Sequence, residues 1–342
     1  MKVLHVISGL RSGGAEHFVL GLCRQSKKDP GTEMSVLTLG TVDDISHKFR
    51  EAGIEVITAP GNKPNNRSFK AFSAFRILLR QPHKIIHAHM FHACVIACCV
   101  KLFRPSIKIV FTLHNDHVSH FHRRIFLFFT RSLRKTDVVF PGMKRKWFQK
   151  SKPAIVANGI DVAQFSFSDE KPPGFLCAFV GRLNHEKNPL FLVELAKAFR
   201  GKPLRISVAG DGPLRTALEQ KILSENLSRH FNVMGNLDDV TILLSRCHCL
   251  LIPSLWEGMP LVLLEAAASG VPVIATPVGV IPSLVSDDEG YVGELHTFPG
   301  MLTKVIENYD EALAKAQRLK QKIIASYSIE RSYSLYKSIY SH

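Results

Sequence analysis

Two glutamates, Glu257 and Glu265, stand eight positions apart around a stretch that could bind an anion. The apolar run Leu250–Ile252 predicts a buried strand, and Pro260 suits the first position of the helix that follows it. Gly270 suits the end of that helix. The unpaired N–H groups at such a helix start attract phosphate. Two carboxylates around an anion site suit a ligand that has both a phosphate and hydroxyls, as a nucleotide sugar has.

A second loop adds positive charge. Arg182 and Lys187 follow the predicted strand Leu176–Val180 and precede a predicted helix. A departing nucleoside diphosphate builds up negative charge, and preorganised cations stabilise that charge. Alone, two loop cations are usually solvated side chains, and it is their place ahead of the glutamate motif that favours a function.

Glycines follow two further predicted strands. Gly13 and Gly14 lie after the first strand of the chain, where backbone N–H groups could approach a phosphate, although a tight turn would also explain them. Gly210 and Gly212 lie after another strand. They would either bring backbone close to a nucleotide or make a plain strand-to-helix turn.

Taken together, these motifs resemble the signature of the group 1 family of retaining glycosyltransferases, which have the GT-B fold. The longest match is P-S-x-x-E-G-x-P-x-x-x-L-E-A-x-A-x-G-x-P-V over residues 253–273. Residues 181–188 are similar to the family's G-R-x-x-x-x-K-G/N motif, residues 210–213 to its G-x-G-P turn and residues 13–16 to its G-G-A-E loop. The resemblance implies transfer of a sugar from a nucleoside diphosphate sugar, with retention of configuration.

The resemblance also implies roles for single residues. Glu265 would hold the ribose hydroxyls and Glu257 a hydroxyl of the transferred sugar, while Arg182 and Lys187 would bind the diphosphate. Residues 112–114 resemble the family's T-x-H element, in which His114 reaches toward the transferred sugar. His114, Glu257, Arg182 and Lys187 are therefore the expected catalytic residues. The donor-binding residues implied are Gly13, Gly14, Gly210, Gly212, Gly258, Met259, Pro260, Leu261 and Glu265.

No resident metal or other cofactor is expected, because the sequence has no D-x-D motif. His87, His89 and His92 offer imidazoles, but no Cys-x-x-Cys or His-Glu-x-x-His pattern supports a zinc site. His89 is expected instead to face the acceptor. No enzymatic nucleophile stands out, so the departing phosphate oxygen is expected to deprotonate the acceptor.

Strand-like and helix-like segments alternate along the chain, which favours an α/β protein with parallel sheets. The resemblance implies two Rossmann-like domains facing each other across a cleft. Residues 1–168 would bind the acceptor, residues 169–325 would bind the donor, and a helix within 326–342 would cross back to the first domain. The predicted strands are Val3–Ile7, Ser35–Leu39, Glu55–Ala59, Lys84–Ala88, Lys108–Thr112, Asp137–Phe140, Leu176–Val180, Arg205–Ala209, Asn232–Met234, Cys249–Ile252 and Val271–Ala275.

The positive charge lies in the first half of the chain. Residues 1–150 carry 25 Lys and Arg against nine Asp and Glu, while residues 151–342 carry 19 against 20. Residues 101–150 mix their cations with Phe and Trp, which favours the anionic inner face of a membrane. Nucleic acid and an ordinary solvated basic face remain alternatives.

Seven scattered cysteines and no predicted secretory or membrane-spanning segment favour a cytoplasmic protein, peripheral on the inner face of the cell membrane. The expected partners are a nucleotide sugar and a lipid-linked or oligosaccharide acceptor in lipopolysaccharide or polysaccharide synthesis, and not nucleic acid. Two other functions are left open. They are a GT-B sugar-nucleotide epimerase or hydrolase, and a basic nucleic-acid-binding α/β protein.

Overall fold

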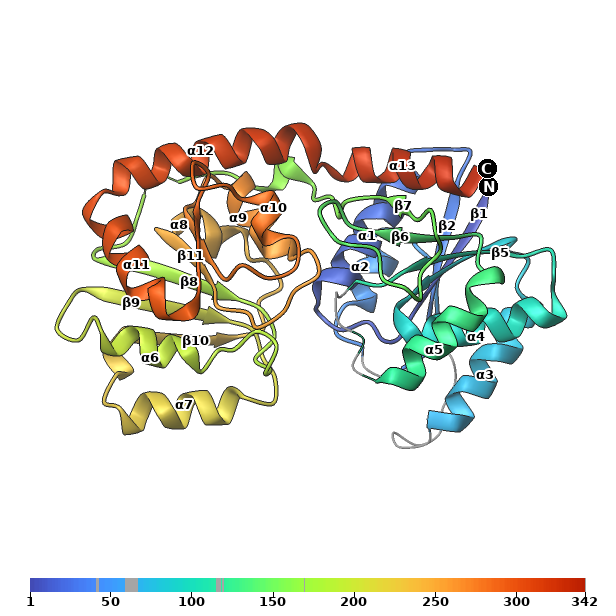
Figure 1. Cartoon of the computed structure of the whole chain (residues 1–342), viewed down its shortest axis with the longest axis horizontal. Helices are drawn as coiled ribbons and strands as arrows, with labels where there is room; N and C mark the ends of the chain where they lie inside the picture. The colour runs from blue at the N-terminus through green and yellow to red at the C-terminus, as the bar shows by residue number, and fades with distance from the viewer. Residues whose placement is uncertain (41–42, 59–66, 115–117, 119, 169, 342) are drawn as a thin grey trace. The chain divides into compact units, whose positions relative to one another are not determined.

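The computed structural model describes the chain except residues 41–42, 59–66, 115–117, 119, 169 and 342, and except the side chains of residues 67–70. It contains two compact units (Figure 1). Unit 1 comprises Met1–Gly159 and Ile329–His342, and unit 2 comprises Ile160–Ser328. The ends of two predicted segments, Ala59 and Asp169, lie outside the described residues, as does His342.

Unit 1 is built on a parallel sheet with the strand order β3-β2-β1-β4-β5-β6-β7. The first six positions have the order of a Rossmann fold, in which ligands bind beyond the carboxyl ends of the strands. The strands are β1 (Lys2–Ile7), β2 (Glu33–Thr38), β3 (Val56–Thr58), β4 (Ile85–His89), β5 (Lys108–Thr112), β6 (Thr136–Val139) and β7 (Ala154–Ile155). The helices are α1 (Gly14–Lys27), α2 (Ser46–Glu51), α3 (Arg67–Arg80), α4 (Met90–Phe103), α5 (Phe121–Phe129) and α13 (Ile329–Ser341), with the short 3-10 turn η1 (Thr130–Ser132).

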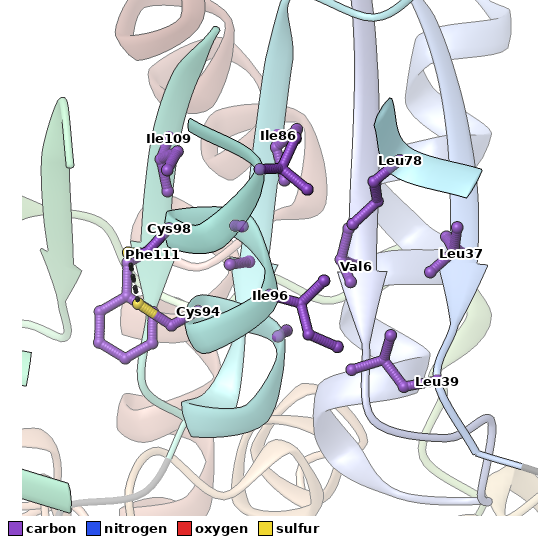
Figure 2. Packing of buried hydrophobic residues seen from close by; sticks show 14 of the residues in the cluster. Val6, Leu37, Leu39, Leu78, Ile86, Cys94, Ile96, Cys98, Ile109 and Phe111 are labelled. Atoms are coloured by element: carbon purple, nitrogen blue, oxygen red, sulfur yellow. Dashed lines mark hydrogen bonds between the residues drawn. The ribbon is translucent and has the colours of Figure 1, made fainter. Parts of the chain in front are cut away.

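One face of this sheet is apolar and lies under α3, α4 and α5. Apolar residues of β1, β2, β4 and β5 point to it, and three of them, Val6, Ile86 and Phe111, are fully buried (Figure 2). Leu78 of α3 and Ile96 of α4 pack against them. The intervening residues of the same strands point to the opposite face, and that face carries histidines.

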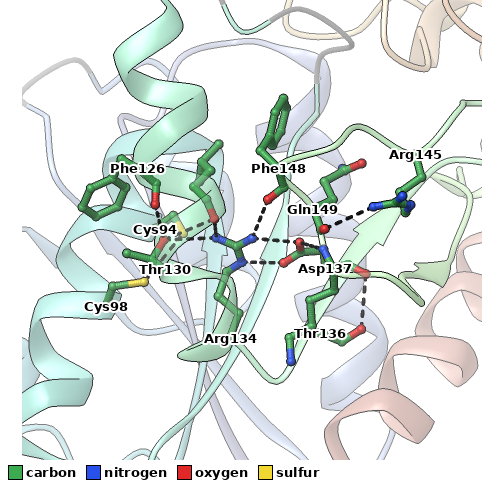
Figure 3. A network of polar contacts seen from close by, with 12 residues as sticks. Cys94, Cys98, Phe126, Thr130, Arg134, Thr136, Asp137, Arg145, Phe148 and Gln149 are labelled. Atoms are coloured by element: carbon green, nitrogen blue, oxygen red, sulfur yellow. Dashed lines mark hydrogen bonds and ion pairs between the residues drawn. The ribbon is translucent and has the colours of Figure 1, made fainter.

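A buried ion pair fixes the segment between α5 and β6. Arg134 donates from Nε and Nη2 to the two carboxylate oxygens of Asp137, at 2.6 and 3.0 Å, and neither side chain is exposed (Figure 3). The remaining guanidinium hydrogens reach the carbonyl oxygens of Leu127 and Phe148. Because every part of the pair is hydrogen-bonded, the cost of burying two charges is offset. The network therefore holds the end of α5 against β6.

Helix α13 covers part of the histidine face of unit 1 and packs against α1. The hydroxyl of Tyr333 donates to Asp29, which also pairs with Lys337. The hydroxyl of Tyr340 lies 2.6 Å from Nδ1 of His87. Residues from the far end of the sequence thus complete the polar contacts of the first sheet.

Unit 2 contains a second parallel sheet, of order β10-β9-β8-β11-β12-β13. Its strands are β8 (Phe175–Val180), β9 (Leu204–Ala209), β10 (Phe231–Gly235), β11 (Cys249–Ile252), β12 (Val273–Ala275) and β13 (Tyr291–Val292). Its helices are α6 (Phe191–Lys197), α7 (Arg215–Ser224), α8 (Thr241–Arg246), α9 (Leu261–Ala268), α10 (Ile281–Leu284), α11 (Phe298–Glu307) and α12 (Tyr309–Ser326), with 3-10 turns η2 (Val162–Gln164), η3 (Ser228–His230) and η4 (Leu295–Thr297).

All eleven predicted strands are present, and those at 108–112 and 249–252 agree residue for residue. The others differ by one or two residues at one or both ends. Strands β7 and β13 were not predicted, because each is two residues long and shows no periodic pattern. The prediction of an α/β protein with two parallel sheets is confirmed.

Candidate active site

Glu257 lies in the loop between β11 and α9, and its side chain is buried. The hydroxyl of Ser254 donates to its Oε1 at 2.7 Å, and Nζ of Lys187 lies 2.5 Å from the same oxygen. Ser254 is itself held by Thr276, whose hydroxyl donates to the Ser254 carbonyl at 2.6 Å. The carboxylate is therefore fixed in one orientation by a hydroxyl and an ammonium group.

Lys187 reaches Glu257 because β8 and β11 are neighbours in the sheet, so the loops that follow them meet. The Lys187 N–H donates to Oδ1 of Asn184 at 3.0 Å, which closes the loop after β8. The N–H of Leu255 then donates to the Glu186 carbonyl at 2.8 Å and joins the two loops. Two of the predicted catalytic residues are thus brought together.

The loop after β9 supports the loop that carries Lys187. Gly210 has a φ of +139°, and a Cβ there would lie 2.0 Å from the Gly181 carbonyl oxygen. A Cβ on Gly212 would lie 2.5 Å from the carbonyl oxygen of Leu183. The absent side chains at these glycines make room for neighbouring backbone, which favours the scaffold role over a direct nucleotide contact. Arg182 lies on the supported loop with an exposed side chain.

Helix α9 begins one residue later than predicted. Pro260 is its N-cap, with an extended ψ of 119°, and Leu261 is the first helical residue. The prediction that Pro260 opens the helix is therefore wrong, and its missing N–H is equally harmless at the cap. Gly258 and Met259 are buried. A Cβ on Gly279 would lie 2.6 Å from the Gly258 carbonyl oxygen, so the loop after β12 packs tightly on this turn.

Glu265 lies in the second turn of α9, and its side chain is partly buried. Loss of hydration, followed by the negative charge of Asp239, raises the pKa of its carboxyl from 4.5 to about 7. The carboxyl is therefore poised to change its charge near neutral pH. A ligand hydroxyl that donates to it would favour the ionised form.

This raised pKa predicts a pH-dependent stability. A carboxyl whose pKa is higher in the folded state stabilises the fold below its unfolded value of 4.5, and this contribution is lost as the pH rises through 7. A Glu265→Gln variant should therefore match the wild type near pH 4 and become the more stable protein near pH 8. Urea unfolding at both pH values measures this. Exposed Glu311, changed to Gln, is the control, and equal curves for wild type and Glu265→Gln at pH 8 would contradict the prediction.

The glycines at the start of α1 differ from Gly210 and Gly212 of unit 2 in their backbone conformation and in what surrounds them. Gly13 is the N-cap of α1, with an ordinary extended φ of −143°, and Gly14 is the first helical residue. A Cβ on Gly13 would meet only the flexible side chain of Glu16, at 2.7 Å. Gly14 is exposed. The backbone at this helix start is therefore accessible, as an anion site would need.

His114 follows β5 in unit 1, and its Nε2 lies 2.8 Å from Nδ1 of His89. Burial lowers the pKa of His114 to about 4, so its ring is neutral at neutral pH. His89 is fully buried and also contacts His5, at 2.9 Å. The expectation that His89 faces the acceptor is therefore wrong, because both of its ring nitrogens are used inside the unit.

Two residues of these arrangements, Ser254 and His5, were not predicted from the sequence. Ser254 orients Glu257, and the signal for it was the hydroxyl three positions upstream in the P-S-x-x-E run. His5 supports His89, but a histidine inside an apolar strand gives no sign of its partner.

Two family matches cover most of the chain. Residues 163–324 match the family described as "Glycosyl transferases group 1", and residues 12–164 match "Glycosyltransferase Family 4".

Individual relatives are more distant. A UDP-Gal:alpha-D-GlcNAc-diphosphoundecaprenol alpha-1,3-galactosyltransferase of Escherichia coli is 26% identical over 217 residues, which are 58% of this chain and 56% of that protein. The putative glycosyltransferase EpsF of Bacillus subtilis (strain 168) is 26% identical over 302 residues, 80% of this chain and 78% of that one. The matched part thus spans little more than half of the first relative and over three quarters of the second.

Among solved structures, HepE of Anabaena in complex with UDP and glucose superposes with a TM-score of 0.86. The match covers 100% of this chain and 99% of that chain, at 16% sequence identity. The likeness concerns the fold, and it agrees with the predicted GT-B class.

Proposed function

The chain belongs to the group 1 family of glycosyltransferases, and on that premise we propose that it transfers a sugar from a UDP-sugar, with retention of configuration, to a lipid-linked saccharide. The observation that carries the proposal is the pair Lys187–Glu257, whose charged groups lie 2.5 Å apart, with Glu257 in the loop that leads into α9. A cation, a carboxylate and a helix start in one place suit a diphosphate joined to a sugar.

In this proposal, different residues of unit 2 bind different parts of the donor. Lys187, with Arg182 on the same loop, neutralises the charge that develops on the departing diphosphate. Glu257 accepts a hydrogen bond from a hydroxyl of the transferred sugar, and Glu265 accepts from the ribose. Gly258, Met259 and the first residues of α9 shape the turn around the phosphates. We assign Gly13, Gly14 and His114 to the substrate side of unit 1.

The proposal includes no resident metal. Among the residues that the structure describes, one cluster of metal-binding side chains has its atoms close enough together, His5, His87 and His89. Each of its six ring nitrogens already has a hydrogen-bond partner. In this proposal the cations of the loop after β8, and not a metal ion, neutralise the charge of the diphosphate.

Donor binding can be tested without knowing the acceptor. UDP at about 100 times its dissociation constant should stabilise the wild type by about 2.7 kcal/mol. A Glu265→Ala variant should lose most of this stabilisation, because the ribose hydroxyls lose their acceptor. Thermal unfolding with UDP, GDP, ADP and CMP measures the effect, and Glu311→Ala, at an exposed position of α12, is the control. No stabilisation of wild type by any nucleotide would contradict the proposed donor site.

The stereochemical part of the proposal has its own readout. With a UDP-sugar and a lipid-linked acceptor, proton NMR of the product should show the anomeric configuration of the donor. The opposite anomer would contradict retention. Sugar release without an acceptor would point instead to a hydrolase.

The proposed acceptor rests on two observations. The galactosyltransferase relative is named for an acceptor linked to diphosphoundecaprenol. Unit 1 also exposes large apolar side chains beside its many cations. On and beside α3, α4 and α5, these are Phe72, Leu102, Phe103, Phe121, Ile125, Phe129 and Trp147. Aromatic side chains among Lys and Arg suit the interface of an anionic bilayer.

The ring contacts support one membrane-facing patch on α5. Trp147 lies 6.4 Å from Phe121 and 5.5 Å from Phe128, and Arg131 stacks on Phe128 at 4.1 Å. Phe129 is 74% exposed. Among the described residues, no helix is long and apolar enough to span a bilayer.

Membrane binding should therefore depend on α5. A Phe121→Ser/Phe129→Ser variant should bind vesicles containing phosphatidylglycerol at least about tenfold more weakly than wild type, because two exposed rings leave the interface. Co-sedimentation at low and high salt measures this. Leu223→Ser/Ile242→Ser removes two equally exposed side chains from unit 2 and should bind normally. Equal binding by both double variants would contradict the assignment of this patch.

A further inference from the structure

Three buried side chains of unit 1 and the partly buried His114 form one continuous chain of hydrogen bonds across neighbouring strands. Sδ of Met34 on β2 lies 3.4 Å from Nε2 of His5 on β1. Nδ1 of His5 lies 2.9 Å from Nε2 of His89 on β4, and Nδ1 of His89 lies 2.8 Å from Nε2 of His114 after β5. We call this the histidine chain.

All three rings are neutral at neutral pH. Burial lowers the pKa of His5 to about 3 and that of His114 to about 4, and it lowers the pKa of His89 well below its usual value. A neutral imidazole has one N–H donor and one bare nitrogen acceptor. Each hydrogen bond of the histidine chain therefore joins the donor of one ring to the acceptor of the next.

Met34 determines which nitrogen donates in each hydrogen bond of the histidine chain. A thioether sulfur accepts hydrogen bonds but has no hydrogen to donate. Nε2 of His5 is therefore the protonated nitrogen, which leaves Nδ1 of His5 to accept from Nε2–H of His89. In the same way, Nδ1 of His89 accepts from Nε2–H of His114. The proton is on Nε2 in every ring, so Nδ1 of His114 is a bare acceptor.

The end of the chain is open. Within the described part of the protein, Nδ1 of His114 is buried and has no hydrogen-bond partner. A buried acceptor without a partner costs free energy, which a donated hydrogen bond from a ligand would offset. A sugar hydroxyl is such a donor.

We propose that Met34, His5 and His89 are positioning residues that hold His114 in the tautomer whose Nδ1 accepts a hydrogen bond from a substrate hydroxyl. The inference rests on the proposed function, since the hydroxyl belongs to a sugar substrate. His87 lies on the same strand as His89 but belongs to a separate network, bonded to Thr112 and Tyr340.

The tautomers can be measured without any substrate. Nitrogen-15 NMR of protein labelled at histidine distinguishes protonated from bare ring nitrogens. At pH 7, His5, His89 and His114 should each show a protonated Nε2 and a bare Nδ1. A protonated Nδ1 on His114 would overturn the proposal. This outcome is independent of the proposed function, which fails separately if UDP-sugars do not bind or react.

Two variants of His89 separate positioning from simple packing. Asn places an amide near the position of Nδ1 of the histidine and can accept from His114, whereas Leu fills the space without an acceptor. We expect kcat/KM to fall about tenfold in His89→Leu and to recover to within about threefold of wild type in His89→Asn. A packing role would give the opposite order, because leucine suits a buried site better than an amide.

The matched control is His83, a buried histidine of the same unit. It is hydrogen-bonded to Ser35 and does not belong to the histidine chain. His83→Leu and His83→Asn should both keep kcat/KM within about twofold of wild type. If His89→Leu is as active as His89→Asn, or more active, the positioning role is overturned.

Discussion

A Lys187→Ala variant is expected to lose about a thousandfold in kcat/KM for sugar transfer, the largest kinetic effect predicted for this chain. The ammonium group supplies a fixed positive charge where the departing diphosphate becomes more negative. Removing this group also takes away one of the two side-chain partners of the buried Glu257, so that only Ser254 remains. Breaking a fully buried ion pair costs about 3–5 kcal/mol, and the cost here is lower because Lys187 stays partly exposed.

A double-mutant cycle tests whether the two residues act as one unit. Glu257→Gln alone should also be strongly impaired, and Lys187→Ala/Glu257→Gln should lose no more than about tenfold beyond Lys187→Ala. Lys197→Ala is the matched control, because Lys197 pairs with Glu194 and Glu225 on the surface of the same unit. The role assigned to Lys187 is wrong if its alanine variant folds normally and keeps more than about a tenth of the activity.

A Gly210→Ala variant is expected to lose at least about 3 kcal/mol of stability. The added Cβ would lie 2.0 Å from the Gly181 carbonyl oxygen, and the φ of +139° is itself unfavourable for alanine. The backbone cannot move freely at either glycine, because Gly181 directly follows β8 and Gly210 directly follows β9, and both strands are hydrogen-bonded in the sheet. A loss of this size should lower the Tm of unit 2 by about 6–12 °C. The displaced loop also carries Lys187, so UDP binding should weaken with it.

Gly300 provides the control for this substitution. It lies inside α11, and a Cβ there would meet nothing within 4 Å. Gly300→Ala should leave the Tm unchanged or raise it, since alanine favours a helix over glycine by about 1 kcal/mol. Calorimetry of the two variants makes the comparison. Equal Tm values would show that the contact between the two loops has no energetic importance.

The strands were predictable because a buried parallel strand is an uninterrupted apolar run, as in 108–112 and 249–252. Lys187 and Glu257 could be placed near each other from their motifs, because both follow the carboxyl ends of strands in one sheet. Their direct contact could not be predicted, since it depends on Asn184 and Ser254 turning the two loops toward each other. The histidine chain was not predicted, for a different reason. Its members lie on β1, β2, β4 and after β5, and only the strand order makes them neighbours.

The place of α13 in unit 1 affects how the protein folds during its synthesis. A domain made first usually folds first, as it leaves the ribosome. Here Tyr333, Lys337 and Tyr340 complete contacts with Asp29 and His87, but they are translated only after the whole of unit 2. Until then, unit 1 has an uncovered polar face beside its sheet. Unit 1, most of which is made first, therefore finishes folding last. A chain truncated before residue 329 would contain all of unit 2 but would lack the α13 segment of unit 1.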